Sequence, residues 1–149
     1  MEKIKVLQRI AEIYAQGGNI IQYLRGLGNN KHNTTEDILI SYDFQAGSYV
    51  KFAKSNATYL QNYTQTVAKV IDSLGVFESI MEVGVGEATT LSNFVTKLSH
   101  QPKSILGFDI AWSRIKYARQ YAHSLGINDA KLVVGDLFAP PMAANSVDI

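Results

Sequence analysis

The sequence predicts an α/β protein in which a helical region precedes a parallel sheet. Three observations lead to this prediction. Apolar residues recur at helical spacing through the first half of the chain, up to Gly75. After Gly75, short apolar runs alternate with helical patterns, which is typical of parallel strands joined by helices. A glycine-rich stretch stands where the first of these strands must turn into a helix.

The region 1–75 is expected to be helical. A first helix ends at Gly17 and Gly18, and a second is expected over 20–27 with Asn19 as its N-cap. The run over 37–44 fits either helix or strand, with helix favoured. A long helix should follow from about residue 55 and close at Gly75 in the left-handed conformation. The apolar faces predicted for the first and last of these helices are Ile4, Leu7, Ile10, Ala11 and Tyr14, and Tyr59, Tyr63, Val67, Val70, Ile71 and Leu74.

The region 76–149 is expected to form an α/β unit. Ser113 should be the N-cap of its second helix, and Gly126 should end that helix. The stripe that this helix should bury is Ile115, Ala118, Ala122 and Leu125. The expected strands are 79–83, 105–110 and 131–137, and the expected helices are 89–98 and 113–125.

Composition excludes several classes of function. Of the 149 residues, 46% are hydrophobic and 18% are charged, as in ordinary folded domains. A formal net charge of +1 gives no overall electrostatic basis for binding nucleic acid or an anionic membrane. The absence of cysteine excludes disulfides and thiolate chemistry, and the three histidines have no metal-ligand spacing, so no metal site is predicted. With no apolar leader or membrane-length segment, we expect a soluble, cytoplasmic protein.

The strongest chemical signal lies in the segment 80–89, Ile-Met-Glu-Val-Gly-Val-Gly-Glu-Ala-Thr. Gly84 and Gly86 can adopt dihedrals that a Cβ forbids, and they let a ligand approach the backbone closely. The helix that follows directs its free N–H groups to the same place. The same pattern also fits a plain strand-to-helix turn, so it predicts a ligand site only together with other residues.

Carboxylates accompany this turn. Glu82 stands two residues before Gly84, Asp109 ends the second predicted strand, and Asp136 ends the third. Ligands of open α/β sheets bind outside the carboxyl ends of the strands, where Asp109 could reach the ribose hydroxyls of a nucleoside. Each acid alone could be solvated or could cap a helix. The glycine turn, Asp109 and Asp136, at the ends of successive predicted strands, together predict a nucleoside site.

The ligand could be a dinucleotide or a cationic nucleoside. The dinucleotide fingerprint has a third glycine where this chain has Thr89. Glu82 and Glu87 would also repel a pyrophosphate, whereas an acid before the turn suits a ligand with an ammonium group. The electrostatics therefore favour a cationic nucleoside, and an NAD(P)-dependent oxidoreductase is the alternative.

Residues 76–149 resemble the class I, Rossmann-like S-adenosylmethionine-dependent methyltransferases. The first motif of that family is acid-x-Gly-x-Gly-x-Gly, which this chain matches with Glu82, Gly84 and Gly86. Ala88 stands in place of the final glycine. The resemblance implies a Rossmann-like parallel sheet comprising the first three to four strands of the family's fold, with a helical segment before it.

The resemblance also implies a cofactor and a role for each site residue. Glu82 and the turn backbone would hold the methionine end of S-adenosylmethionine. Asp109 corresponds to the family's ribose-binding acid, with Ile110 packing on the adenine. Asp136 corresponds to the adenine-binding acid, and the Leu137 backbone N–H would reach a ring nitrogen. No catalytic residue is assigned.

The methyl acceptor is not identified by the sequence. We expect a small molecule, since no basic stripe indicates nucleic acid. In the resembled family, variable helical segments such as 1–75 often cover the substrate. The aromatic cluster over 42–49 could form a lid on the ligand, or it could be an amphipathic helix ending at Gly47. A non-catalytic cofactor-binding or interaction module is a further alternative.

The resembled fold has more strands than this chain supplies. Val147, Asp148 and Ile149 have the character of a fourth strand that is cut partway. We therefore expect a truncated or natural fragment of a longer protein. The incomplete strand would lie next to the first and leave an unpaired edge, so self-association through that edge is predicted.

Overall fold

The structure, a computed structural model, describes residues 2–149 and confirms the α/β class with a parallel sheet. The described residues form three strands, β1 (Ser79–Val83), β2 (Ser104–Asp109) and β3 (Lys131–Val134), hydrogen-bonded in the order β1-β2-β3. Asp109 at the end of β2 lies beside Val134 at the end of β3. Because all three strands are parallel, their carboxyl ends meet at one edge of the sheet.

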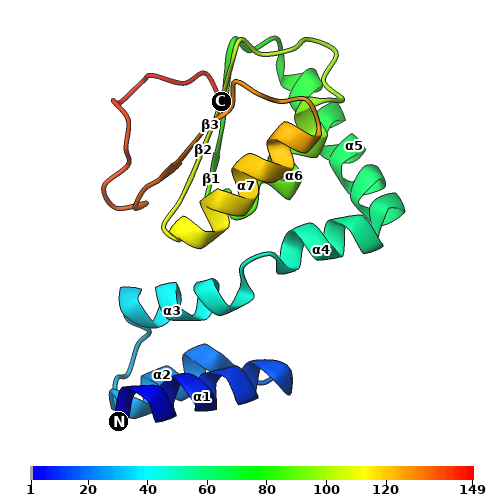
Figure 1. Cartoon of the computed structure of the whole chain (residues 1–149). Coiled ribbons are helices and arrows are strands. Elements are labelled where there is room, and N and C mark those ends of the chain that lie inside the picture. Colours follow the sequence, from blue (N-terminus) through cyan, green and yellow to red (C-terminus); the bar gives the residue numbers. More distant parts are fainter. Residues whose placement is uncertain (1) are drawn as a thin grey trace. The chain divides into compact units, whose positions relative to one another are not determined.

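Two helices connect these strands, α6 (Thr89–Val95) and α7 (Trp112–Ser124), and both lie on one face of the sheet (Figure 1). The main hydrophobic core lies between them, the sheet and α5 (Ala57–Leu74). Burial of this apolar surface is the main favourable term in folding the unit. Its most buried members include Ala68, Ile80, Val85, Ala88, Leu91, Val95, Ile115, Ala118, Ala122 and Leu132.

The start of α7 differs from the prediction. Ala111, not Ser113, is its N-cap, with an extended backbone. The cause is Asp109, whose carboxylate accepts the Ala111 N–H at 2.9 Å and so fixes where the strand ends and the helix begins. The predicted stripe of α7 is confirmed except at Leu125, which is exposed and follows the helix. Gly126 ends the helical path with a positive φ, as predicted.

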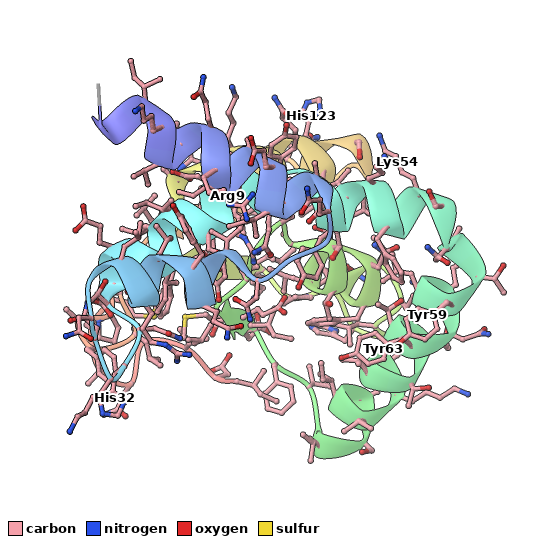
Figure 2. All side chains as sticks on the ribbon, turned by 90° about the horizontal axis from the view of Figure 1, so that it is seen from below. Arg9, His32, Lys54, Tyr59, Tyr63 and His123 are labelled. Atoms are coloured by element: carbon pink, nitrogen blue, oxygen red, sulfur yellow. The ribbon has the colours of Figure 1, made fainter. Side chains whose placement is uncertain are left out.

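Helices α4 (Ser48–Ser55) and α5 precede the sheet in the same compact unit. The apolar face predicted for α5 is confirmed at Val67 and Ile71, which pack against the core. It is wrong at its other four positions, which are exposed, and the most buried residues of α5 are Leu60, Thr64 and Ala68. Tyr59 and Tyr63 lie side by side on its exposed surface, with their rings stacked at 6.5 Å (Figure 2). Gly75 ends α5 with φ 134° and ψ −166°, which is not the left-handed helical conformation that was predicted.

The N-terminal helices form a small cluster of their own. They are α1 (Glu2–Ala15), α2 (Ile20–Leu27) and α3 (Thr35–Gln45), packed around Ile10, Ile20 and Leu24. Val6 and Ile13 pack beside Ile10, so the face predicted for α1 is wrong except at that residue, and Ile4, Leu7 and Tyr14 are exposed.

Two of the predictions for α2 and α3 are confirmed. The Asn19 side chain accepts the Gln22 N–H at 2.9 Å and caps α2. The ambiguous run over 37–44 is helical. Its helix starts at a reciprocal cap, in which the Asp37 carboxylate accepts the Thr34 N–H and the Thr34 hydroxyl accepts the Asp37 N–H.

The chain divides into two compact units, 1–45 and 46–149. Helices α4 and α5 therefore belong with the sheet, although the sequence groups them with the N-terminal helices. The functional division into a cover over 1–75 and a ligand-binding unit over 76–149 stays a prediction. None of the described helices is long and apolar enough to cross a membrane.

The segment after β3 returns to the outer side of β1. Ile149 O accepts the Met81 N–H at 2.9 Å, and one oxygen of the Asp148 carboxylate accepts the N–H groups of Glu78 and Ser79 at 2.9 and 2.8 Å. These bonds lower the pKa of Asp148, with the Ser79 N–H as the largest cause. The segment thus lies next to β1, as predicted for a fourth strand, but 147–149 has no strand conformation.

Candidate functional site

The turn between β1 and α6 has three left-handed residues at alternate positions. Gly84, Gly86 and Ala88 have φ values of +69°, +54° and +54°. Between them, the Val85 N–H donates to Phe108 O in β2 at 2.9 Å, which ties the turn to the neighbouring strand. A Cβ built on Gly84 would meet no atom within 4 Å, so the backbone of the turn is open on that side.

Ala88 adopts the conformation for which glycine is the usual residue. It is fully buried, and its carbonyl accepts the Ser92 N–H in α6 at 2.9 Å. A left-handed conformation costs a residue with a Cβ roughly 1–2 kcal/mol. The position where the methyltransferase motif has its last glycine therefore keeps the glycine conformation in this chain.

Asp109 joins the turn to the end of β2. Asp109 is buried, with 6% of its surface exposed. One carboxylate oxygen accepts the Gly86 N–H at 3.0 Å, and the other accepts the Ala111 N–H at 2.9 Å. A carboxylate has about four lone-pair sites, so Asp109 keeps acceptor capacity for a ligand. Asp109 therefore holds the turn in place, a role that the sequence did not indicate.

Glu82 lies at the base of the turn, half-buried in β1. One of its oxygens accepts the Leu91 N–H at 3.0 Å and so caps α6 from outside the helix. Desolvation by burial raises the pKa of this carboxyl to about 7, although the bond from Leu91 opposes the shift. A cation placed beside Glu82 would favour its ionised form, so the group can respond to a cationic ligand.

The residues after β3 form a turn instead of the predicted continuation of the strand to residue 137. The Asp136 carboxylate accepts the Phe138 N–H at 2.9 Å, and the Asp136 carbonyl accepts the Ala139 N–H at 3.1 Å. These two bonds bend the chain where the strand would have continued. Asp136 is half-buried, whereas the Leu137 side chain is exposed.

The structure brings part of this segment to the edge where the glycine turn lies. The Gly135 N–H donates to Asp109 O at 3.0 Å, so the chain leaves β3 directly beside the end of β2. Ile110, which follows Asp109, is half-buried. Asp109 therefore contacts both the glycine turn, through Gly86, and Gly135, the first residue after β3. Glu82 lies in β1 and Asp136 in the turn after β3, and these are the two outer strands of the described sheet.

Glu87 is a site residue whose role the sequence did not reveal. Its carboxylate is 2% exposed, and its two oxygens accept the N–H groups of Gly47 and Val50 at 2.8 and 2.7 Å. It therefore caps α4 from a distance of about 40 positions in the sequence. The only sequence signal was Gly47, which predicted a helix end but not the new helix that starts at Ser48.

The aromatic cluster over 42–49 therefore spans the end of α3, a turn and the first residues of α4. A helix does end just before Gly47, as that alternative predicts, but Tyr49 belongs to a second helix. The lid alternative stays a prediction. Among the described residues, no group of three or more histidine, aspartate or glutamate side chains could hold a metal ion.

Comparisons with known proteins add little to this site. No protein-family model matches the sequence. No curated protein matches it either. A solved structure, the methyltransferase domain of bacterial CtHen1-C, is similar with a TM-score of 0.42 and 22% sequence identity. The match covers 52% of this chain and 40% of that chain.

Proposed function

We propose that this chain is a class I S-adenosylmethionine-dependent methyltransferase, or the cofactor-binding portion of one, that acts on a small-molecule acceptor. The observation that carries the proposal is the hydrogen bond from Gly86 N–H to Asp109. It joins a left-handed glycine turn to an acid at the end of the neighbouring parallel strand. This edge is where ligands of open α/β sheets bind.

The residues of the turn fit the methionine end of S-adenosylmethionine. The backbone beside Gly84 is open, and a Cβ on Gly86 would meet only the Arg114 guanidinium, at 3.7 Å. Glu82 offers a carboxyl that becomes more acidic beside an ammonium group. When bound, S-adenosylmethionine supplies a methyl group on a positively charged sulfur. The turn would hold that group in a fixed orientation, and catalysis in such a site depends largely on alignment.

The nucleoside end has matching acceptors. Asp109 retains lone pairs for the ribose hydroxyls, and Ile110 follows it as an apolar neighbour for a base. In this proposal Asp136 accepts from the adenine amino group. The Leu137 N–H donates to a ring nitrogen. The Leu137 side chain itself is exposed.

Binding of S-adenosylhomocysteine tests the proposal without a guess at the acceptor. Titration calorimetry should show binding to the full chain, weakened roughly 10- to 150-fold by Asp109→Ala, because a charged acceptor contributes about 1.5–3 kcal/mol. Asp129→Ala is the matched control, since Asp129 is exposed and precedes β3 at the opposite end of the strand.

Three results would count against this assignment. Unchanged affinity in Asp109→Ala would remove the ribose role. Binding of NAD(H) without binding of S-adenosylhomocysteine would favour a dinucleotide-dependent oxidoreductase. Binding of S-adenosylhomocysteine without methyl transfer to any candidate acceptor would favour a non-catalytic module. Mass spectrometry of the purified protein for a co-purifying nucleoside gives an independent reading of the ligand.

A further inference from the structure

The N-terminal turn of α4 depends on a side chain from another part of the chain. The first N–H groups of any helix have no partner within the helix. The N-cap residue of α4 is Gly47, which has no side chain that could accept them. The buried Glu87 carboxylate accepts two of these N–H groups, those of Gly47 and Val50. A negative charge at this end also interacts favourably with the helix dipole.

Helix α7 contacts the same turn of α4. A Cβ on Gly47 would lie 2.9 Å from the Tyr117 ring, so only glycine fits there without displacing that ring. The φ of Gly47, +92°, also favours glycine. The guanidinium carbon of Arg114 lies 5.2 Å from the centre of the Tyr49 ring. The start of α4 is thus held by the glycine turn and by α7.

The position of Glu87 within the glycine turn connects this contact to the ligand site. Glu87 stands between Gly86 and Ala88, and both neighbours are left-handed. The backbone dihedrals of these neighbours set the direction in which the Glu87 carboxylate points. A ligand that fixes the turn therefore also fixes the acceptor that caps α4.

We propose that Glu87 is a positioning residue that makes the glycine turn and the first turn of α4 one cooperative unit. Ligand binding at the glycine turn then orders α4, and a properly capped α4 favours ligand binding by the same factor, since such coupling is reciprocal. This inference rests on the proposed function, because it takes S-adenosylhomocysteine as the ligand of the turn.

Hydrogen exchange of the full chain, measured by mass spectrometry with and without S-adenosylhomocysteine, tests the coupling. In the wild type, the ligand should slow exchange both in the glycine turn and over 47–55 in α4. In Glu87→Gln, protection should persist in the turn and be lost in α4, and affinity should fall about 5- to 150-fold. Glu78→Gln is the matched control, because Glu78 is exposed and its carboxylate contacts Lys103 at 2.8 Å.

Gly47→Ala tests the same coupling from the side of α4. It strains the cap without changing any residue of the glycine turn, so it should also weaken S-adenosylhomocysteine binding by more than twofold. Lys54→Ala, near the end of α4, should not (Figure 2). If Glu87→Gln does not fold, the Gly47→Ala variant still tests whether the glycine turn and α4 are coupled.

The outcomes separate the two proposals. Binding to the wild type without protection of α4 overturns the coupling and leaves the proposed function in place. An affinity within twofold of the wild type in Gly47→Ala overturns the coupling in the same way. No binding of S-adenosylhomocysteine to the wild type overturns both.

Discussion

At the scale of single residues, Glu82 should make stability depend on pH. Its pKa is about 7 in the fold against 4.5 in the unfolded chain, so the folded state holds the proton more tightly. The free energy of unfolding should therefore fall as pH rises from about 4.5 to about 7, and this contribution is lost above that range. Glu82→Gln removes the ionisation but keeps the size and an acceptor for the Leu91 N–H.

Urea unfolding at pH 5 and pH 8 measures this effect. From pH 5 to pH 8, the free energy of unfolding of Glu82→Gln should rise relative to that of the wild type by about 2–3 kcal/mol. The reason is that one pKa unit corresponds to about 1.4 kcal/mol. Parallel pH dependences in the two proteins would contradict the raised pKa.

Residue roles that depend on neighbours along the chain were predictable from the sequence. The spacing of Gly84 and Gly86 located the left-handed turn, and Asp109 was placed at the end of its strand. The role of Glu87 was not predictable, because the N–H groups that it caps lie about 40 positions earlier. Asp136 was placed on a strand because nothing in a single sequence shows that its side chain will accept the Phe138 N–H and bend the chain.

At the scale of elements, two leucines of α5 should differ in their contribution to stability. Leu60 is 8% exposed and packs with Ala53 and Tyr121, whereas Leu74 is 63% exposed at the end of the helix. Leu60→Ala should lower the free energy of unfolding by about 2–5 kcal/mol. Leu74→Ala should change it by about 0.5 kcal/mol or less.

Chemical denaturation of both variants, with the wild type alongside, gives this comparison directly. Equal losses would mean that the packed face of α5 is not the one described. The matched leucine-to-alanine changes remove the same atoms, so helix propensity does not account for a difference between them.

Strands were easier to predict than the buried faces of helices. The strand over 79–83 was predicted with its observed bounds, because a short apolar run is ended by turn residues that are visible in the sequence. Helices α1 and α5 carry apolar residues on more than one stripe. Which stripe is buried depends on the partner: Ile10 packs against α2, and Ala68 against the core under α6. That choice is made by tertiary packing.

At the scale of the whole molecule, the alternation of strands and helices predicted the parallel sheet, and its order β1-β2-β3 follows from short connections. The compact units, 1–45 and 46–149, do not follow from local pattern. Helix α4 is tied to residues far along the chain, including Glu87, and such contacts leave no mark in the composition of the region 46–75.

The outer edge of β1 gives a prediction for the molecule as a whole. The Asp148 carboxylate accepts three hydrogen bonds, from the N–H groups of Glu78 and Ser79 and from the Ser79 hydroxyl. Asp148→Ala should release this segment and expose a strand edge, which favours pairing with a second copy of the chain. Sedimentation velocity at matched concentrations should show a larger average mass than for the wild type.

The control for this prediction is Asp129→Ala, which removes an exposed acid just before β3, a strand that is not paired with β1. It should sediment like the wild type. If Asp148→Ala also does so, then the segment after β3 does not protect the strand edge.

The contact of Asp148 and Ile149 with the outer edge of β1 also has a consequence for the native-state dynamics. On one side β1 is paired along its length with β2, and on the other it is held by a few exposed bonds from residues about 70 positions later. Local openings occur first where few contacts hold the backbone. Exposure of this edge would then be a sub-global fluctuation. The tendency to associate would then depend on the free energy of that local opening, and not on the free energy of global unfolding. Two variants of equal overall stability would therefore differ in association if their opening free energies differ.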